Sequence, residues 1–168
     1  MTRVPLVLSA LLIGALSFAQ CPYQPEITAA ANEFHVPAPL LTAVAMAESG
    51  GDAHAYNPET AAPTPAITPA QARLGWTPDA LRASYGLFQV RGVTAWALGQ
   101  HGPPSALLDP LLSARLAAKL LARLVIVYGS WDAALAAYNG GWNAAQAFLS
   151  GAPISDYVAR VNASACEP

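Results

Sequence analysis

The chain carries little charge and few cysteines. Only 11% of its 168 residues are charged, and 8 basic residues against 10 acidic ones give a formal net charge of −2. A nucleic-acid-binding domain would present a basic face, so we expect no nucleic-acid partner. The 2 cysteines and 3 histidines are scattered without metal-ligand spacing. We therefore expect neither a metal nor a cofactor.

Long apolar runs are missing except at the start of the chain. Arg3 precedes a mostly apolar segment, residues 4–16, and small residues at positions 17 and 19 fit cleavage after Ala19. The segment is shorter than the ~20 residues that span a bilayer. We interpret residues 1–19 as a signal peptide and expect a periplasmic or extracellular protein without a membrane span after cleavage. An uncleaved anchor, or a lipid attached to Cys21, is the alternative.

The two cysteines, Cys21 and Cys166, stand at opposite ends of the predicted mature chain. In an oxidising compartment an even number of cysteines favours a disulfide. Closing so long a loop can contribute about 4–5 kcal/mol to stability. Two free buried thiols are the alternative.

Alternation of apolar and polar residues, which would indicate strands, is also missing. Helical spacing predicts a single all-α domain over residues 20–168, with helices at 26–35, 39–49, 110–128, 131–138, 142–149 and 155–163. In the longest one, Asp109 is the expected N-cap, and one face is apolar: Leu112, Leu116, Leu120, Leu124 and Val127. Residues 86–90 could form a short extended piece. Residues 56–77 contain four prolines, which predicts a long surface loop.

Glu48 is the first candidate for chemistry. It lies at the end of the apolar segment 40–47, just before Gly50 and Gly51 stop the helix. Burial and the negative end of the helix dipole both raise the pKa of a carboxyl group. An acid that keeps its proton near neutral pH is suited to general acid catalysis. A solvated glutamate in the last helical turn is the simpler interpretation of this segment alone.

Three further motifs follow in order: Ser84-Tyr85-Gly86-Leu87-Phe88-Gln89-Val90, Ala137-Tyr138-Asn139-Gly140-Gly141 and Tyr157-Val158-Ala159-Arg160-Val161. Together with Glu48-Ser49-Gly50-Gly51 they resemble the SLT-type lytic transglycosylases, relatives of goose-type lysozyme. The resemblance covers about residues 24–161 and implies a lysozyme-like fold. It also implies a monomeric enzyme that cuts the glycan strands of peptidoglycan. Glu48 would be its single catalytic acid, and the product would carry a 1,6-anhydromuramoyl end.

The same resemblance implies which residues line the cleft. They are Asn57, Gly86, Leu87, Phe88, Gln89, Tyr138, Asn139 and Tyr157. For several of them a structural role is the alternative: a turn around Gln89, a helix C-cap at Asn139 and a core aromatic at Tyr157.

The chain departs from the family pattern in three places. Glu48 and Gln89 are 41 residues apart, farther than in compact relatives, because the proline-rich segment lies between them. That segment should either lengthen one wall of the cleft or pack outside it. Phe88 stands where methionine is commoner. Asp156 is the only acid shortly before Tyr157, which puts any second-carboxylate role there in doubt.

Two alternatives to the transglycosylase stay open. One is a hydrolytic lysozyme in which Glu48 works with water, and Asp52, Glu59 or Asp79 could in principle activate that water. Solvated loop acids are the simpler interpretation of these three residues. The other alternative is a catalytically silent protein that binds or scaffolds peptidoglycan.

Overall fold

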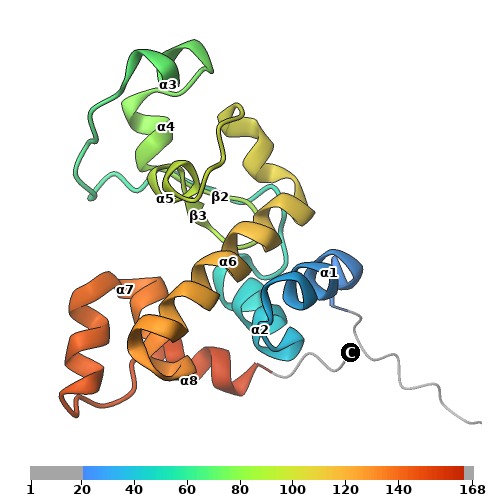
Figure 1. Cartoon of the computed structure of the whole chain (residues 1–168), viewed down its shortest axis with the longest axis vertical. Helices are drawn as coiled ribbons and strands as arrows, with labels where there is room; N and C mark the ends of the chain where they lie inside the picture. Colours follow the sequence, from blue (N-terminus) through green and yellow to red (C-terminus); the bar gives the residue numbers. More distant parts are fainter. Residues whose placement is uncertain (1–20, 165–168) are drawn as a thin grey trace, which may run out of the picture.

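The computed structural model describes residues 21–164 (Figure 1). The predicted signal peptide and Cys166 lie outside the described residues, so the cleavage site and the disulfide stay predictions. Among the described residues, no helix is both long enough and apolar enough to cross a membrane.

A body of five helices forms one part of the molecule. The central helix is α6 (Pro110–Tyr128). Both α1 (Gln24–Phe34) and α7 (Trp131–Leu149) pack directly against it, while α2 (Ala38–Ser49) lies against α1 and α8 (Asp156–Ala163). The predicted helices of this body are confirmed to within a few residues, as is the all-α class.

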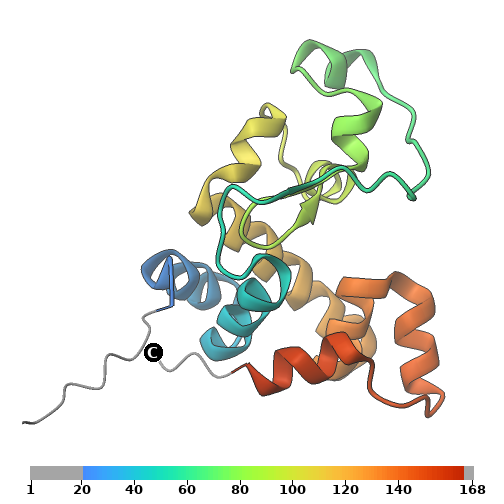
Figure 2. The ribbon, with the colours of Figure 1, turned by 180° about the vertical axis from the view of Figure 1, so that it is seen from behind.

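A smaller lobe is inserted between α2 and α6 and stands at one end of the body (Figures 1 and 2). Its base is an antiparallel sheet of three two-residue strands, β1 (Tyr56–Asn57), β2 (Ser84–Tyr85) and β3 (Val90–Arg91), in that order. The lobe also contains α3 (Pro69–Arg73), α4 (Pro78–Arg82), α5 (Gly92–Ala97) and the 3₁₀ helix η1 (Pro104–Leu108). Strands this short leave no periodicity in the sequence, which is why no sheet was expected.

Local signals set the ends of the long helices. The carboxylate of Asp109 accepts a hydrogen bond from the N–H of Leu112 at 2.7 Å, and Gly129 ends α6 in the left-handed conformation. Ser130 caps α7 in the same way. Gly141 is non-helical and kinks α7, so the two predicted helices at 131–138 and 142–149 are the two halves of one kinked helix.

The predicted apolar face of α6 is only partly its packing face. Leu116 is buried, and Leu112 and Leu120 pack against the core, whereas Val127 is 70% exposed. The other buried apolar residues of the helix are Ala114, Ala117, Ala118 and Leu121. The helix is covered from two sides, by α1 and by α7. The contacts therefore involve the alanines as well as the first part of the leucine stripe, and the end of the stripe is left exposed.

The proline-rich segment is more ordered than a surface loop. Thr68 and Gln71 form a capping box that starts α3, with Thr68 N–H donating to Gln71 Oε1 at 2.8 Å. Trp76 is 1% exposed, and its Nε1–H donates to the carbonyl of Gly102 at 2.8 Å. The end of the segment is therefore anchored in the core of the lobe.

Of the possible extended piece, residues 86–90, only Val90 lies in a strand, and residues 86–89 do not. They form the turn between β2 and β3, in which Gly86 (φ 68°) and Gln89 (φ 46°) both have left-handed backbones. A Cβ atom on Gly86 would collide with the carbonyl oxygen of Leu107. Glycine is thus required by close packing of the turn against η1.

Candidate active site

Glu48 lies in the last turn of α2, at the junction of the helical body and the lobe. Gly50 ends the helix in the left-handed conformation and donates its N–H to the carbonyl of Met46 at 3.0 Å. The hydroxyl of Ser49 donates to the carbonyl of Leu87 at 2.8 Å, which ties the end of α2 to the turn. The Glu48 side chain is half-buried.

Tyr157, from the first turn of α8, contacts the Glu48 carboxyl group directly. Its hydroxyl donates a hydrogen bond to Glu48 Oε1 at 2.7 Å, and the residue is only 4% exposed. The guanidinium of Arg160 lies 5.9 Å from the centre of the Tyr157 ring. One turn of α8 therefore brings a hydrogen-bond donor and a positive charge to the carboxyl group.

The environment of Glu48 raises its pKa. Burial is the main cause, and the negative charge of Glu59 adds to it, while the hydrogen bond from Tyr157 and the positive charge of Arg160 act in the opposite direction. Burial also raises the pKa of Tyr157 and of Tyr138, and the charge of Glu48 adds to both shifts. Both phenols therefore keep their protons, so Tyr157 acts as a donor to Glu48 and not as a base.

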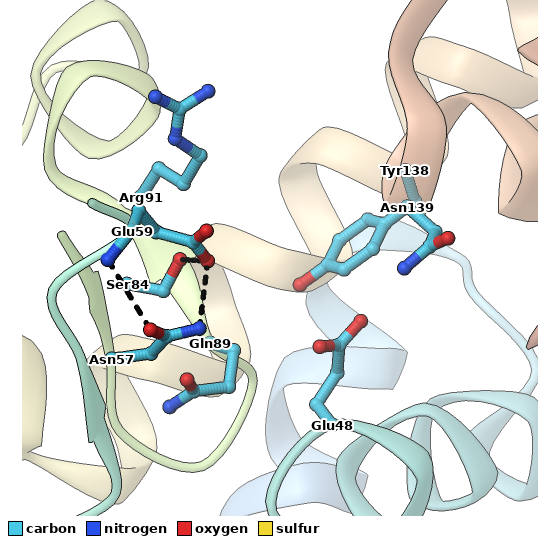
Figure 3. A pocket seen from close by; sticks show the side chains of 8 residues that line it. All are labelled: Glu48, Asn57, Glu59, Ser84, Gln89, Arg91, Tyr138 and Asn139. Atoms are coloured by element: carbon cyan, nitrogen blue, oxygen red, sulfur yellow. Dashed lines mark hydrogen bonds between the residues drawn. The ribbon is translucent and has the colours of Figure 1, made fainter. Parts of the chain in front are cut away.

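Glu48 opens into a cavity of about 270 Å³ with mostly polar walls (Figure 3). The cavity is lined by Glu48, Asn57, Glu59, Ser84, Gln89, Arg91, Tyr138 and Asn139. Glu48 and the two α7 residues form one side, and the strands of the lobe form the other. Such an open, polar cleft suits a hydrophilic substrate rather than a compact apolar ligand.

Three of the predicted cleft residues do not line the cavity. Leu87 and Phe88 are 0% exposed, so their side chains belong to the core, and Gly86 packs against η1. The turn instead supplies two main-chain acceptors: the Leu87 carbonyl for Ser49, and the Phe88 carbonyl for the Tyr138 hydroxyl at 2.8 Å. The turn thus acts as a frame that fixes the ends of α2 and α7.

The other predicted residues do reach the site. The cavity is lined by four of them, Asn57, Gln89, Tyr138 and Asn139. Tyr157 contacts Glu48 without lining the cavity itself. Gln89 also has a structural role, because its side-chain amide donates to the carbonyls of Gly86 at 3.0 Å and of Ala55 at 3.2 Å. Asn139 is exposed.

Among the acids weighed as partners of Glu48, only Glu59 lines the cavity. Asp52 is exposed and accepts a hydrogen bond from its own loop, at the N–H of His54. Asp79 pairs with Arg82 at 2.6 Å, and Asp156 is exposed in the first turn of α8.

Sequence reasoning missed two residues of the lobe wall, Ser84 and Arg91. Ser84 begins the Gly86 motif, and Arg91 follows it directly, so both could have been found by extending that motif along an expected strand. Within residues 21–164, no group of three or more His, Cys, Asp or Glu side chains could hold a metal ion.

The comparison with protein families settles the assignment. The model of the transglycosylase SLT domain matches residues 25–154, which is most of the chain. The chain belongs to the SLT transglycosylase family. Its all-α architecture is the lysozyme-like fold of that family. SLT domains act on peptidoglycan outside the cytoplasm, and the family activity is that of lytic transglycosylases.

Tyr157 lies beyond the last residue of the SLT match, so its contact with Glu48 is a feature that the structure adds. No curated protein and no solved structure matches the chain.

Proposed function

We propose that this SLT domain cleaves the β-1,4 bond between N-acetylmuramic acid and N-acetylglucosamine in peptidoglycan without consuming water. The product is a 1,6-anhydromuramoyl end. The observation that carries the proposal is the half-buried carboxyl group of Glu48, which has a raised pKa and lies at the wall of an open polar cleft. A binding protein has no need of such an acid, which argues against a silent scaffold.

In the proposed mechanism, Glu48 first donates its proton to the glycosidic oxygen as the bond to the muramoyl anomeric carbon breaks. The resulting carboxylate then accepts the proton of the muramoyl O6 hydroxyl while that oxygen bonds to the anomeric carbon. Because the nucleophile belongs to the substrate, its approach needs no activated water. Glu48 is protonated again at the end, ready for the next turnover.

Tyr157 supports both halves of this cycle. Its hydroxyl, 2.7 Å from Glu48 Oε1, stabilises the carboxylate after proton donation and holds the side chain in place. Burial opposes this effect and keeps the carboxyl group protonated beforehand. The balance lets one group serve as acid and then as base.

The polar cavity residues are proposed to hold the sugars. The amides of Asn57, Gln89 and Asn139 both donate and accept hydrogen bonds, as the hydroxyl and acetamido groups of the glycan require. The Tyr138 ring adds an apolar surface beside them. We further propose that the protein is exported, works as a monomer, and needs neither metal nor cofactor.

The deciding experiment is Glu48→Gln with purified peptidoglycan. This variant keeps the shape and the hydrogen-bond acceptor of the side chain but removes its proton chemistry. We expect cleavage to be lost by about a hundredfold or more, with an unchanged circular dichroism spectrum. Asp52→Asn is the control, since this exposed acid near α2 keeps its loop acceptor when changed to asparagine. Cleavage by Glu48→Gln at the wild-type rate would refute the assignment.

A further inference from the structure

A second carboxyl group, that of Glu59, faces the same cavity from the lobe. Asn57 Nδ2 donates to Glu59 Oε1 at 3.1 Å, and Ser84 Oγ donates to the same oxygen at 2.9 Å (Figure 3). Within residues 21–164, no group donates a hydrogen bond to the other oxygen, Oε2. The side chain is therefore fixed in place through one oxygen, and the second stays available to a donor in the cavity.

The backbone of Glu59 is held in an unusual conformation. Its φ angle of 49° lies in the left-handed region, which residues other than glycine rarely adopt. The Glu59 N–H donates to Asn57 Oδ1 at 3.2 Å, and Asn57 is paired with Ser84 between β1 and β2. Strain kept in place by its surroundings at the wall of a cleft is a pointer to function.

Glu59 and Glu48 differ in their settings. In Figure 3 they lie on opposite sides of the cavity. Burial raises the pKa of Glu48, whose carboxyl group has Tyr157 as its hydrogen-bond partner, whereas Glu59 accepts hydrogen bonds from Asn57 and Ser84 through Oε1. Two carboxyl groups with such different surroundings are the usual arrangement for an acid and a base in glycoside cleavage.

We propose that Glu59 is a second catalytic base, which activates a water molecule against the anomeric carbon. On this proposal the domain releases reducing muramoyl ends as well as anhydro ends. The inference rests on the proposed function, because it needs Glu48 to break the same bond first.

The hydrolytic step balances without any further reactant. Glu48 gives its proton to the glycosidic oxygen, which leaves with the electron pair of the broken bond. The water oxygen bonds to the anomeric carbon, and its proton passes to Glu59 Oε2. Solvent then takes the proton from Glu59 and returns one to Glu48.

A base is needed if water is to compete at all. The O6 hydroxyl is part of the substrate and has the advantage of proximity. Bulk water has no such advantage. A positioned carboxylate compensates for this by orienting a water molecule and accepting its proton. Glu59 thus sets the ratio of reducing ends to anhydro ends in the product.

The test is product analysis of peptidoglycan digested in heavy-oxygen water. Reducing ends formed by water attack carry the label, whereas anhydro ends are unlabelled and lighter by one water. We expect the wild type to release both. In Glu59→Gln, which keeps the acceptor for Asn57 and Ser84, the ratio of labelled to anhydro ends should fall about tenfold or more. Glu59→Asp, which withdraws the charge by one methylene, should shift the ratio in the same direction, and Asp52→Asn should leave it unchanged.

The outcomes separate this inference from the proposed function. Anhydro ends alone from the wild type, or an unchanged ratio in both Glu59 variants, would overturn the role of Glu59 and leave the transglycosylase intact. Labelled ends alone, lost in Glu59→Gln, would support the role of Glu59 and overturn the anhydro product. No cleavage by the wild type would overturn both.

Discussion

Tyr157 and Glu48 are 109 residues apart in the chain and 2.7 Å apart in space, joined by a hydrogen bond from the phenol to the carboxyl group. The two residues come from α8 and α2, which pack against each other in the helical body. The acid of the cleft is thus fixed by a helix that forms none of the cavity lining. This contact gives the first prediction.

Tyr157→Phe should raise the pKa of Glu48 further, because the hydrogen bond from the phenol favours the carboxylate. Cleavage requires protonated Glu48, so the alkaline limb of the pH–rate profile should move to higher pH. The rate itself should fall about tenfold to a hundredfold, since the acid is held less firmly. Tyr128→Phe, at the far end of α6, is the control. A limb that stays in place or moves to lower pH would contradict the coupling.

Glu48→Gln should make the protein more stable near neutral pH. Because the pKa of Glu48 is raised by folding above its ordinary value of 4.5, the folded state binds more protons than the unfolded state just above that value. Wild-type stability therefore falls as pH rises through this window. The neutral amide avoids that loss, and we expect a gain of about 1 kcal/mol.

The stability difference should disappear in acid. Urea unfolding of both proteins at about pH 7 and about pH 4 measures it, since below its unfolded-state pKa Glu48 is protonated in both states. If the glutamine variant were less stable than the wild type at neutral pH, the Glu48 carboxyl group would not reduce the free energy of unfolding, and the prediction would be wrong.

Gly86→Ala should be far more damaging than an alanine at another left-handed glycine. Gly86 and Gly129 have similar φ angles, 68° and 78°, but a Cβ atom at Gly129 meets nothing within 4 Å. Gly129→Ala should therefore cost about 1–2 kcal/mol in backbone strain alone. Gly86→Ala adds the collision with Leu107 and should cost about 3 kcal/mol or more. Equal losses in denaturant unfolding would show that the turn can move away from η1.

Reduction should destabilise the mature protein if Cys21 and Cys166 are bridged. Loss of the long loop closure predicts a fall of about 10 °C in melting temperature. A variant with both cysteines changed to serine should melt at the same temperature with and without reductant. An unchanged wild-type melting temperature would contradict the bridge.

Local signals made much of the helical body predictable. Helix ends could be predicted from signals that each occupy only a few residues. These signals are the N-cap Asp109 and the terminating glycines Gly129 and Gly50. Glu48 could be found because its apolar helix predicts burial. Only part of the packing surface of α6 could be found in this way, because that surface depends on two neighbours, α1 and α7, that approach from different sides.

The lobe wall was harder to predict, for a physical reason. Glu59 reaches the site only because it follows β1, which pairs with β2. The two strands are separated by a long insertion and contain two residues each. No pattern of that length distinguishes a strand from a loop. Leu87 and Phe88 were placed in the cleft by resemblance, whereas their burial follows from the turn folding back onto the core.

The carbonyl groups of Leu87 and Phe88 accept hydrogen bonds from the hydroxyls of Ser49 and Tyr138, respectively. Every amino acid has the same carbonyl, so these two anchors do not depend on which side chains the turn carries. At the buried positions 87 and 88, substitution is restrained by the apolar surroundings and by the volume available in the core. The geometry around the acid can therefore be inherited unchanged while the residues beneath it are exchanged.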